Sequence, residues 1–147
     1  MSTNYKQFFS NLFNEKARIA QNFGMKLTYN EENQAIITLP YNPLLDHAGD
    51  GIHGGVIATV LDNAGWFTIA LARNGFVVTS EMSFHLLRPA ANTEIWARGK
   101  IIRMGKRQAV AEMQCWDDNE NLIAHSIGTY LYFENKLTQK LQINLNK

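Results

Sequence analysis

The chain of 147 residues contains one cysteine, Cys115. A single cysteine excludes an internal disulfide and any zinc site built from a cysteine cluster. An excess of charge of either sign is also missing, with 14 Lys and Arg against 13 Asp and Glu. A formal charge of +1 gives no overall field that would attract nucleic acid or an anionic membrane. We therefore expect neither as a partner, and we expect a cytoplasmic protein because a lone cysteine suits a reducing compartment.

Long uninterrupted apolar runs are absent as well. The longest apolar stretches are broken by Asp62, Asn63 and Arg73, so we expect no membrane-spanning segment. The N-terminus carries charges through its length and lacks the apolar centre of a signal peptide. What the chain does have is 46% hydrophobic residues, which is enough for one domain with a substantial core.

Two stretches have a helical pattern. Apolar residues recur at helical spacing over residues 4–22, which predicts one amphipathic N-terminal helix, within a segment 1–24 that Gly24 closes. Residues 54–73 predict a long helix with apolar side chains around nearly its whole circumference. Such a helix is buried on every side, so other elements must cover all of it.

The remaining pattern predicts strands, at residues 26–29, 35–39, 76–87, 94–104, 108–117 and 122–133. Short turns between consecutive strands predict antiparallel pairing. The simplest architecture is an α+β domain, residues 25–133, in which a curved antiparallel sheet wraps around the long helix. The N-terminal helix packs on this domain, and residues 134–147 form a polar tail.

A glycine pair, His53-Gly54-Gly55, lies where a polar loop meets the long helix. Glycines at a helix start leave backbone N–H groups that no Cβ covers and that have no partner within the helix. Such groups can stabilise an oxyanion, although glycines also occur simply to shape loops.

Asp62 lies in the middle of the apolar helix, too deep to cap it. A carboxylate in such a place is unfavourable unless it is paired or hydrated. A structural interpretation pairs Asp62 with Arg73 or another cation, or with Asn63. A functional interpretation makes it a general base or a nucleophile whose pKa is raised by burial. The residues alone leave both interpretations open.

Several motifs together resemble one family. They are the loop segment HAGDGIHGG at 47–55, TVLDN at 59–63, VTSEMSF at 78–84, LRPA at 87–90, RMGKR at 103–107 and GTY at 128–130. This combination is similar to the signature of the PaaI-type hotdog-fold acyl-CoA thioesterases and covers about residues 35–133. The resemblance implies a hotdog fold and hydrolysis of an acyl-CoA thioester to a free acid and coenzyme A.

The resemblance also implies roles for single residues. Asp62 matches the family's acidic residue, which acts as nucleophile or general base, and Gly54 matches the glycine whose N–H binds the thioester carbonyl. His53 matches the histidine that supports this loop, and Thr79 a hydroxyl position that in some members helps to hold the attacking water. His47 stands where the family usually has Asn or Gln, and its imidazole could make a similar hydrogen bond.

Further residues are candidates for binding the substrate. Gly55 offers a second amide beside that of Gly54, and Trp66, one helical turn from Asp62, could line an acyl pocket. Basic side chains could bind the phosphates of coenzyme A, or simply be solvated. They are Arg88, Arg98, Arg103, Lys106 and Arg107.

Two other functions remain open from the sequence. A hotdog hydratase or dehydratase acting on acyl thioesters would need an imidazole base, which His47 or His53 could supply. A non-catalytic acyl-CoA-binding module would need no base at all. A metal site from His47, Asp50 and His53 can be imagined, since imidazole and carboxylate suit zinc or iron, but we expect no metal and no cofactor.

The spacing of Gly54 and Asp62 predicts an assembly. Eight residues of helix separate them by about 12 Å along the axis. A reacting carbon must lie ~3 Å from its nucleophile and close to its oxyanion donor, so one helix cannot supply both groups. Two antiparallel helices about a two-fold axis can. We therefore expect a homodimer with two shared sites, and the resemblance implies that such dimers often pair into homotetramers.

Overall fold

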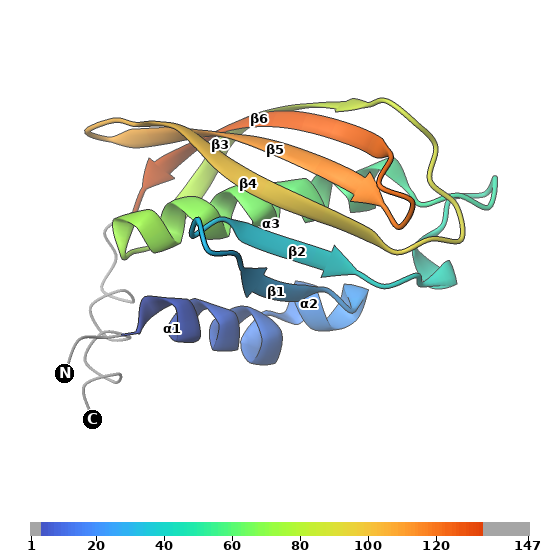
Figure 1. Ribbon diagram of the computed structural model, residues 1–147, viewed down its shortest axis with the longest axis horizontal. Coiled ribbons are helices and arrows are strands. Elements are labelled where there is room, and N and C mark those ends of the chain that lie inside the picture. Colours follow the sequence, from blue (N-terminus) through green and yellow to red (C-terminus); the bar gives the residue numbers. More distant parts are fainter. Residues whose placement is uncertain (1–3, 134–147) are drawn as a thin grey trace.

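A six-stranded antiparallel sheet curves around one long helix in the computed structural model, which describes residues 4–133 (Figure 1). The helix is α3 (Gly54–Arg73). The strands are β1 (Lys26–Tyr29), β2 (Ala35–Leu39), β3 (Val77–Leu86), β4 (Ile95–Met104), β5 (Gln108–Asp117) and β6 (Leu122–Tyr132). This arrangement confirms the predicted α+β hotdog fold. The predicted polar tail, residues 134–147, lies outside the described residues.

The strand order is β1-β2-β4-β5-β6-β3. Antiparallel pairing of consecutive strands is confirmed for β1 with β2, β4 with β5, and β5 with β6. β3 does not pair with β4, which follows it in the sequence, because the loop after Leu86 crosses the sheet to its other half. β3 pairs with β6 instead, so it is an edge strand, and Thr79 lies opposite Tyr130.

The inner face of the sheet packs closely on α3. On β5 every second residue is buried, namely Ala109, Ala111, Met113 and Cys115. On β4, a Cβ at Gly99 would overlap the carbonyl oxygen of Ala64, so only glycine allows the helix to approach this far. Cys115 is 0% exposed, and its burial raises the pKa of the thiol to about 12.

The prediction of one continuous N-terminal helix is wrong. The segment forms α1 (Tyr5–Asn11), a π-helical turn η1 (Leu12–Lys16) and α2 (Arg18–Phe23). Ala17 interrupts the helix with an extended backbone, φ −71° and ψ 110°. The side-chain amide of Asn14 accepts from the Leu27 N–H at 2.8 Å and donates to its carbonyl at 3.1 Å, which ties η1 to β1. Gly24 ends α2 as predicted, with φ 82°.

The long helix α3 has its predicted bounds, but it is not buried on every side in one subunit. Val60, Leu61 and Ala64 face the sheet and are 0% exposed. An open strip remains on another side, where the residues are only partly buried: Ala58, Thr59, Asp62, Asn63 and Trp66. α3 is long and apolar enough to cross a membrane by length and composition alone, yet 56% of its most apolar window is buried, as in the core helix of a globular fold.

Candidate active site

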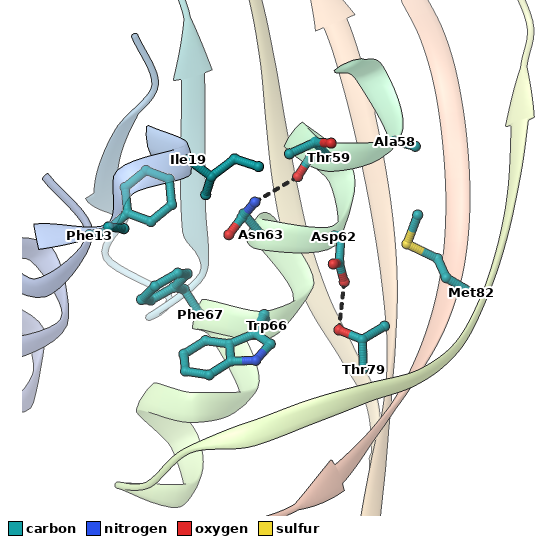
Figure 2. A pocket seen from close by; sticks show the side chains of 11 residues that line it. Phe13, Ile19, Ala58, Thr59, Asp62, Asn63, Trp66, Phe67, Thr79 and Met82 are labelled. Carbon is teal, nitrogen blue, oxygen red and sulfur yellow. Dashed lines mark hydrogen bonds between the residues drawn. The ribbon is translucent and has the colours of Figure 1, made fainter. Parts of the chain in front are cut away.

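Asp62 stands on the open strip of α3, beside a cavity of about 600 Å³ (Figure 2). The Thr79 hydroxyl on β3 donates to Asp62 Oδ1 at 2.8 Å. The Tyr130 hydroxyl on β6 lies 3.3 Å from the same oxygen. Side chains from α3, β3 and β6 therefore meet at one carboxylate oxygen.

The structure contains neither of the contacts that the structural interpretation of Asp62 requires. Arg73 places its guanidinium over the Tyr132 ring, 3.7 Å from the centroid. Asn63 donates its side-chain N–H to the Thr59 carbonyl at 2.8 Å. Within residues 4–133, no cation lies within ion-pair distance of Asp62.

Burial raises the pKa of the Asp62 carboxyl above its ordinary value. The hydrogen bonds from Thr79 and Tyr130 act in the opposite direction, because they stabilise the charged form. Among the described residues that line the cavity, Asp62 is the only one with an ionisable side chain. A partly buried carboxylate without a counter-charge, held by hydroxyl groups, is suited to accept a proton or to attack a carbonyl carbon.

The walls of the cavity are largely apolar. Phe13 and Ile19 come from the N-terminal segment, Trp66 and Phe67 from α3, and Met82 from β3, as Figure 2 shows. Phe13 packs edge-on against Phe67 with ring centroids 5.0 Å apart, and the Trp66 and Phe67 rings are 4.6 Å apart. The sequence predicted Trp66 in this place but gave no reason to bring Phe13 and Ile19 to it.

His53 is the N-cap of α3. Its Nδ1 accepts the Gly55 N–H at 2.9 Å, so that amide is already engaged within the loop. The Gly54 N–H has no acceptor among the described residues. A Cβ at Gly54 would come within 2.7 Å of Leu86 Cδ1. Of the two amides that the sequence suggested, the one at Gly54 is therefore available to a carbonyl oxygen.

His47 shapes its own loop. It is exposed, its imidazole Nδ1 accepts the Gly49 N–H at 2.9 Å, and its backbone N–H donates to the Gly51 carbonyl at 2.8 Å. No hydrogen bond in the described part of the chain joins it to Asp62 or Gly54. In the same range, no three His, Cys, Asp or Glu side chains are arranged to hold a metal ion, so His47, Asp50 and His53 do not form one site.

The basic residues do not form one cluster within a subunit. The turn between β4 and β5 carries Arg103, Lys106 and Arg107. Arg88 lies near the other end of β5, where the pKa of Asp117 is lowered by hydrogen bonds from Asn121 and, more weakly, by the Arg88 charge. Figure 1 shows the β4–β5 turn and the loop between β3 and β4 at opposite ends of the sheet.

The sequence profile of the thioesterase superfamily matches residues 50–124, just over half of the chain. This range contains the glycine pair, Asp62 and Thr79. The chain belongs to the thioesterase superfamily. Hydrolases are thus the enzyme class to which its relatives point.

Individual relatives agree with this assignment. A candidate esterase of Saccharolobus solfataricus is 27% identical over 131 residues, which cover 88% of this chain and 93% of the relative. An X-ray structure of a thioesterase-superfamily protein is also 27% identical, with a TM-score of 0.80 over 88% of this chain and 98% of the other.

More distant structures share the fold. The Escherichia coli PaaI protein of the phenylacetic acid degradation operon has a TM-score of 0.80 at 19% identity, over 91% of this chain and 98% of that one. A Bacillus halodurans protein in complex with CoA has a TM-score of 0.75 at 23% identity, over 89% and 88% of the two chains. The superfamily match confirms the thioesterase family that the resemblance indicated, and these structures confirm the fold that it implied.

Tyr130 is the contact of Asp62 that the sequence did not predict. It belongs to the GTY motif, which contributed to the resemblance without suggesting a role. The signal that could have found it is the strand pairing, because Tyr130 points inward from β6 directly opposite Thr79 on β3.

Proposed function

We propose that this protein is an acyl-CoA thioesterase that uses Asp62 as its nucleophile or general base. The observation that carries the proposal is the Asp62 carboxylate beside an apolar cavity, held by two hydroxyl groups and without a cation among the described residues. A partly buried carboxylate without a counter-charge costs stability, so its presence favours a catalytic role. Membership of the thioesterase superfamily supports the same reaction.

The reaction follows from the available groups. The Gly54 N–H binds the thioester carbonyl oxygen and stabilises the negative charge that develops there. Asp62 either attacks the carbonyl carbon to form an anhydride that water then cleaves, or takes a proton from a water molecule that attacks directly. The carbon–sulfur bond breaks, coenzyme A leaves as the thiolate and is protonated, and water supplies the new oxygen of the free acid.

The proposal includes a homodimer, because one subunit keeps Gly54 and Asp62 apart by about 12 Å along α3. Antiparallel pairing of two α3 helices would bring each Gly54 level with the partner's acid and would cover the open strip. The exposed apolar residues on and beside the edge strand β3 support such a contact: Phe84, Leu86 and Leu87 are 41%, 50% and 55% exposed. Pairing of two dimers into a tetramer completes the proposed assembly.

The proposed site for coenzyme A is basic. Arg103, Lys106 and Arg107 would bind its phosphates, since guanidinium and ammonium groups recognise phosphate well. Arg88 lies at the opposite end of its own sheet, and antiparallel pairing would bring it toward the partner's β4–β5 turn. The CoA complex of the Bacillus halodurans relative supports coenzyme A as the ligand class.

The first test is an acyl-CoA panel with detection of the free thiol. We expect thiol release by the wild type and its loss in Asp62→Ala, while Asp118→Ala, at an exposed turn, stays active. Hydration of an enoyl-CoA in place of thiol release would identify a hydratase. Binding of acyl-CoA with neither reaction would identify a binding module, and either result would overturn the proposal.

Complementation tests the shared site. Asp62→Ala subunits are mixed with subunits inactivated by Gly54→Val, which places a side chain against Leu86. A mixed dimer has one site with both defects and one site with neither. We therefore expect activity to reappear after subunit exchange, although each parent is inactive. Inactive mixed dimers, or an active monomer, would exclude a shared site.

A further inference from the structure

Among the described residues, the Tyr130 hydroxyl has one hydrogen-bond partner besides Asp62. The residue is 0% exposed, and a buried hydroxyl is unfavourable unless it is hydrogen-bonded. It lies 3.2 Å from the Asp62 carbonyl oxygen and 3.3 Å from Asp62 Oδ1. Its other neighbour in the described residues is the Met113 sulfur at 3.9 Å, which is a weak acceptor. The single O–H proton is therefore shared between the backbone and side-chain oxygens of one residue.

Two glycines leave the space that the Tyr130 side chain occupies. A Cβ at Gly65, on α3, would overlap the Tyr130 hydroxyl oxygen. A Cβ at Gly128, on β6, would lie 2.9 Å from the same oxygen. Because neither the helix nor the strand has a side chain at these two positions, the hydroxyl can lie against α3 at Asp62.

The two hydroxyl groups act on one carboxylate oxygen. Thr79 donates to Oδ1 at 2.8 Å, Tyr130 reaches the same atom, and Oδ2 has no donor among residues 4–133. A carboxylate held through one oxygen keeps the other free to react. We infer that Tyr130 is a positioning residue of the proposed thioesterase, which anchors Asp62 through Oδ1 so that Oδ2 attacks the thioester or takes the proton. This inference rests on the proposed function.

The effect of the Tyr130 hydrogen bond on the pKa of Asp62 can be measured. Within residues 4–133, the groups that line the cavity beside Asp62 from β3, from the N-terminal segment and from α3 itself are not ionisable: they include Thr79, Met82, Ile19 and Asn63. Burial, followed by the charge of Asp62, raises the pKa of Tyr130, which therefore remains a protonated donor at working pH. Removing this donor must raise the pKa of Asp62, because the bond stabilises the carboxylate.

Tyr130→Phe tests the inference, and Tyr29→Phe is its matched control. Tyr29 is also largely buried and donates its hydroxyl to α3, to the Phe67 carbonyl at 3.1 Å, without touching Asp62. In Tyr130→Phe we expect the acid limb of kcat/KM to move up by roughly one pH unit, the scale of one hydrogen bond to a charged group. We expect kcat to fall about tenfold with KM nearly unchanged, as for a lost transition-state interaction. Tyr29→Phe should change neither.

A second readout does not need turnover. Carbon-13 NMR of the Asp62 carboxyl should show a higher titration midpoint in Tyr130→Phe than in the wild type, and no shift in Tyr29→Phe. If the wild type hydrolyses no acyl-CoA, the proposed function fails while this titration still decides whether Tyr130 anchors Asp62. Equal midpoints in the wild type and Tyr130→Phe, or an unmoved acid limb, would overturn the inference.

Discussion

Asp62→Asn should abolish turnover and make the protein more stable. Thr79 and Tyr130 both reach Oδ1, and the amide oxygen of Asn can accept from both in the same place. The amide NH2 then replaces Oδ2, the atom that has no donor among the described residues. The substitution thus removes a charge and leaves the surrounding contacts intact.

The size of the effect follows from the pKa of Asp62, which burial raises even though two hydrogen bonds oppose it. Each unit by which the folded-state pKa exceeds the unfolded one costs about 1.4 kcal/mol of stability at neutral pH. In a domain of this size, 1 kcal/mol moves Tm by roughly 2–4 °C. We therefore expect Asp62→Asn to raise Tm at neutral pH, by roughly 2–4 °C for each kcal/mol of this cost.

The stability difference between Asp62→Asn and the wild type depends on pH. The charged form of Asp62 is disfavoured in the folded state. Below the unfolded pKa the group is neutral in both states, so its ionisation costs the wild type no stability there. The wild type loses stability as the pH rises through the higher folded pKa. Calorimetry across acid and neutral pH should show a Tm difference between Asp62→Asn and the wild type that is small in acid and largest at neutral pH.

Asp117→Asn is the control with the opposite sign. Hydrogen bonds from Asn121 and Asn119 lower the pKa of Asp117, so its charge stabilises the fold above the unfolded pKa. This variant should lose stability at neutral pH, and the loss should disappear as the pH falls through the lowered pKa. An Asp62→Asn protein that is no more stable than the wild type at neutral pH, or a pH-independent difference, would refute the reasoning.

Substitutions at two further positions, Ile19 and Arg107, address the substrate. Ile19 lines the cavity from α2. Ile19→Ala should shift the preference toward longer acyl chains and Ile19→Phe toward shorter ones, measured as kcat/KM across a chain-length series. The control Leu44→Ala, at a position that is 89% exposed, should leave this preference unchanged. Arg107→Glu should raise KM for every acyl-CoA alike, and less so at high salt, because it acts on the coenzyme. An effect of Arg107→Glu on one acyl chain alone would contradict this role.

The regular elements of the fold could be predicted because their signals are local. The bounds of α3 and of β5 were predicted without error, since apolar residues recur there with the periods of a helix and a strand. The N-terminal segment has the same helical spacing, yet Ala17 breaks it. That break goes with the contact between Asn14 and Leu27, two residues 13 positions apart, and no local pattern reports such a contact.

The site was predictable to the same extent. Asp62 stands out because its own helix is apolar, and Gly54 because it starts that helix. The place of Tyr130 follows from the pairing of β3 with β6, two strands that are not consecutive in the chain, so strand propensity alone could not bring it to Asp62. Ile19 lies at the cavity on α2, which starts at Arg18 after a break at Ala17 that the helical spacing did not predict.

The burial of Cys115 makes the folded protein unreactive toward thiol reagents. It is the single cysteine of the chain, it is 0% exposed, and its pKa of about 12 leaves almost no thiolate at neutral pH. Colour from a disulfide reagent in a reaction mixture would therefore come from released coenzyme A and not from the protein. When the sheet opens, the same thiol becomes reactive. The rate at which Cys115 is labelled then reports how often the core opens. One reagent can therefore follow product formation in the native protein and unfolding in a destabilised variant.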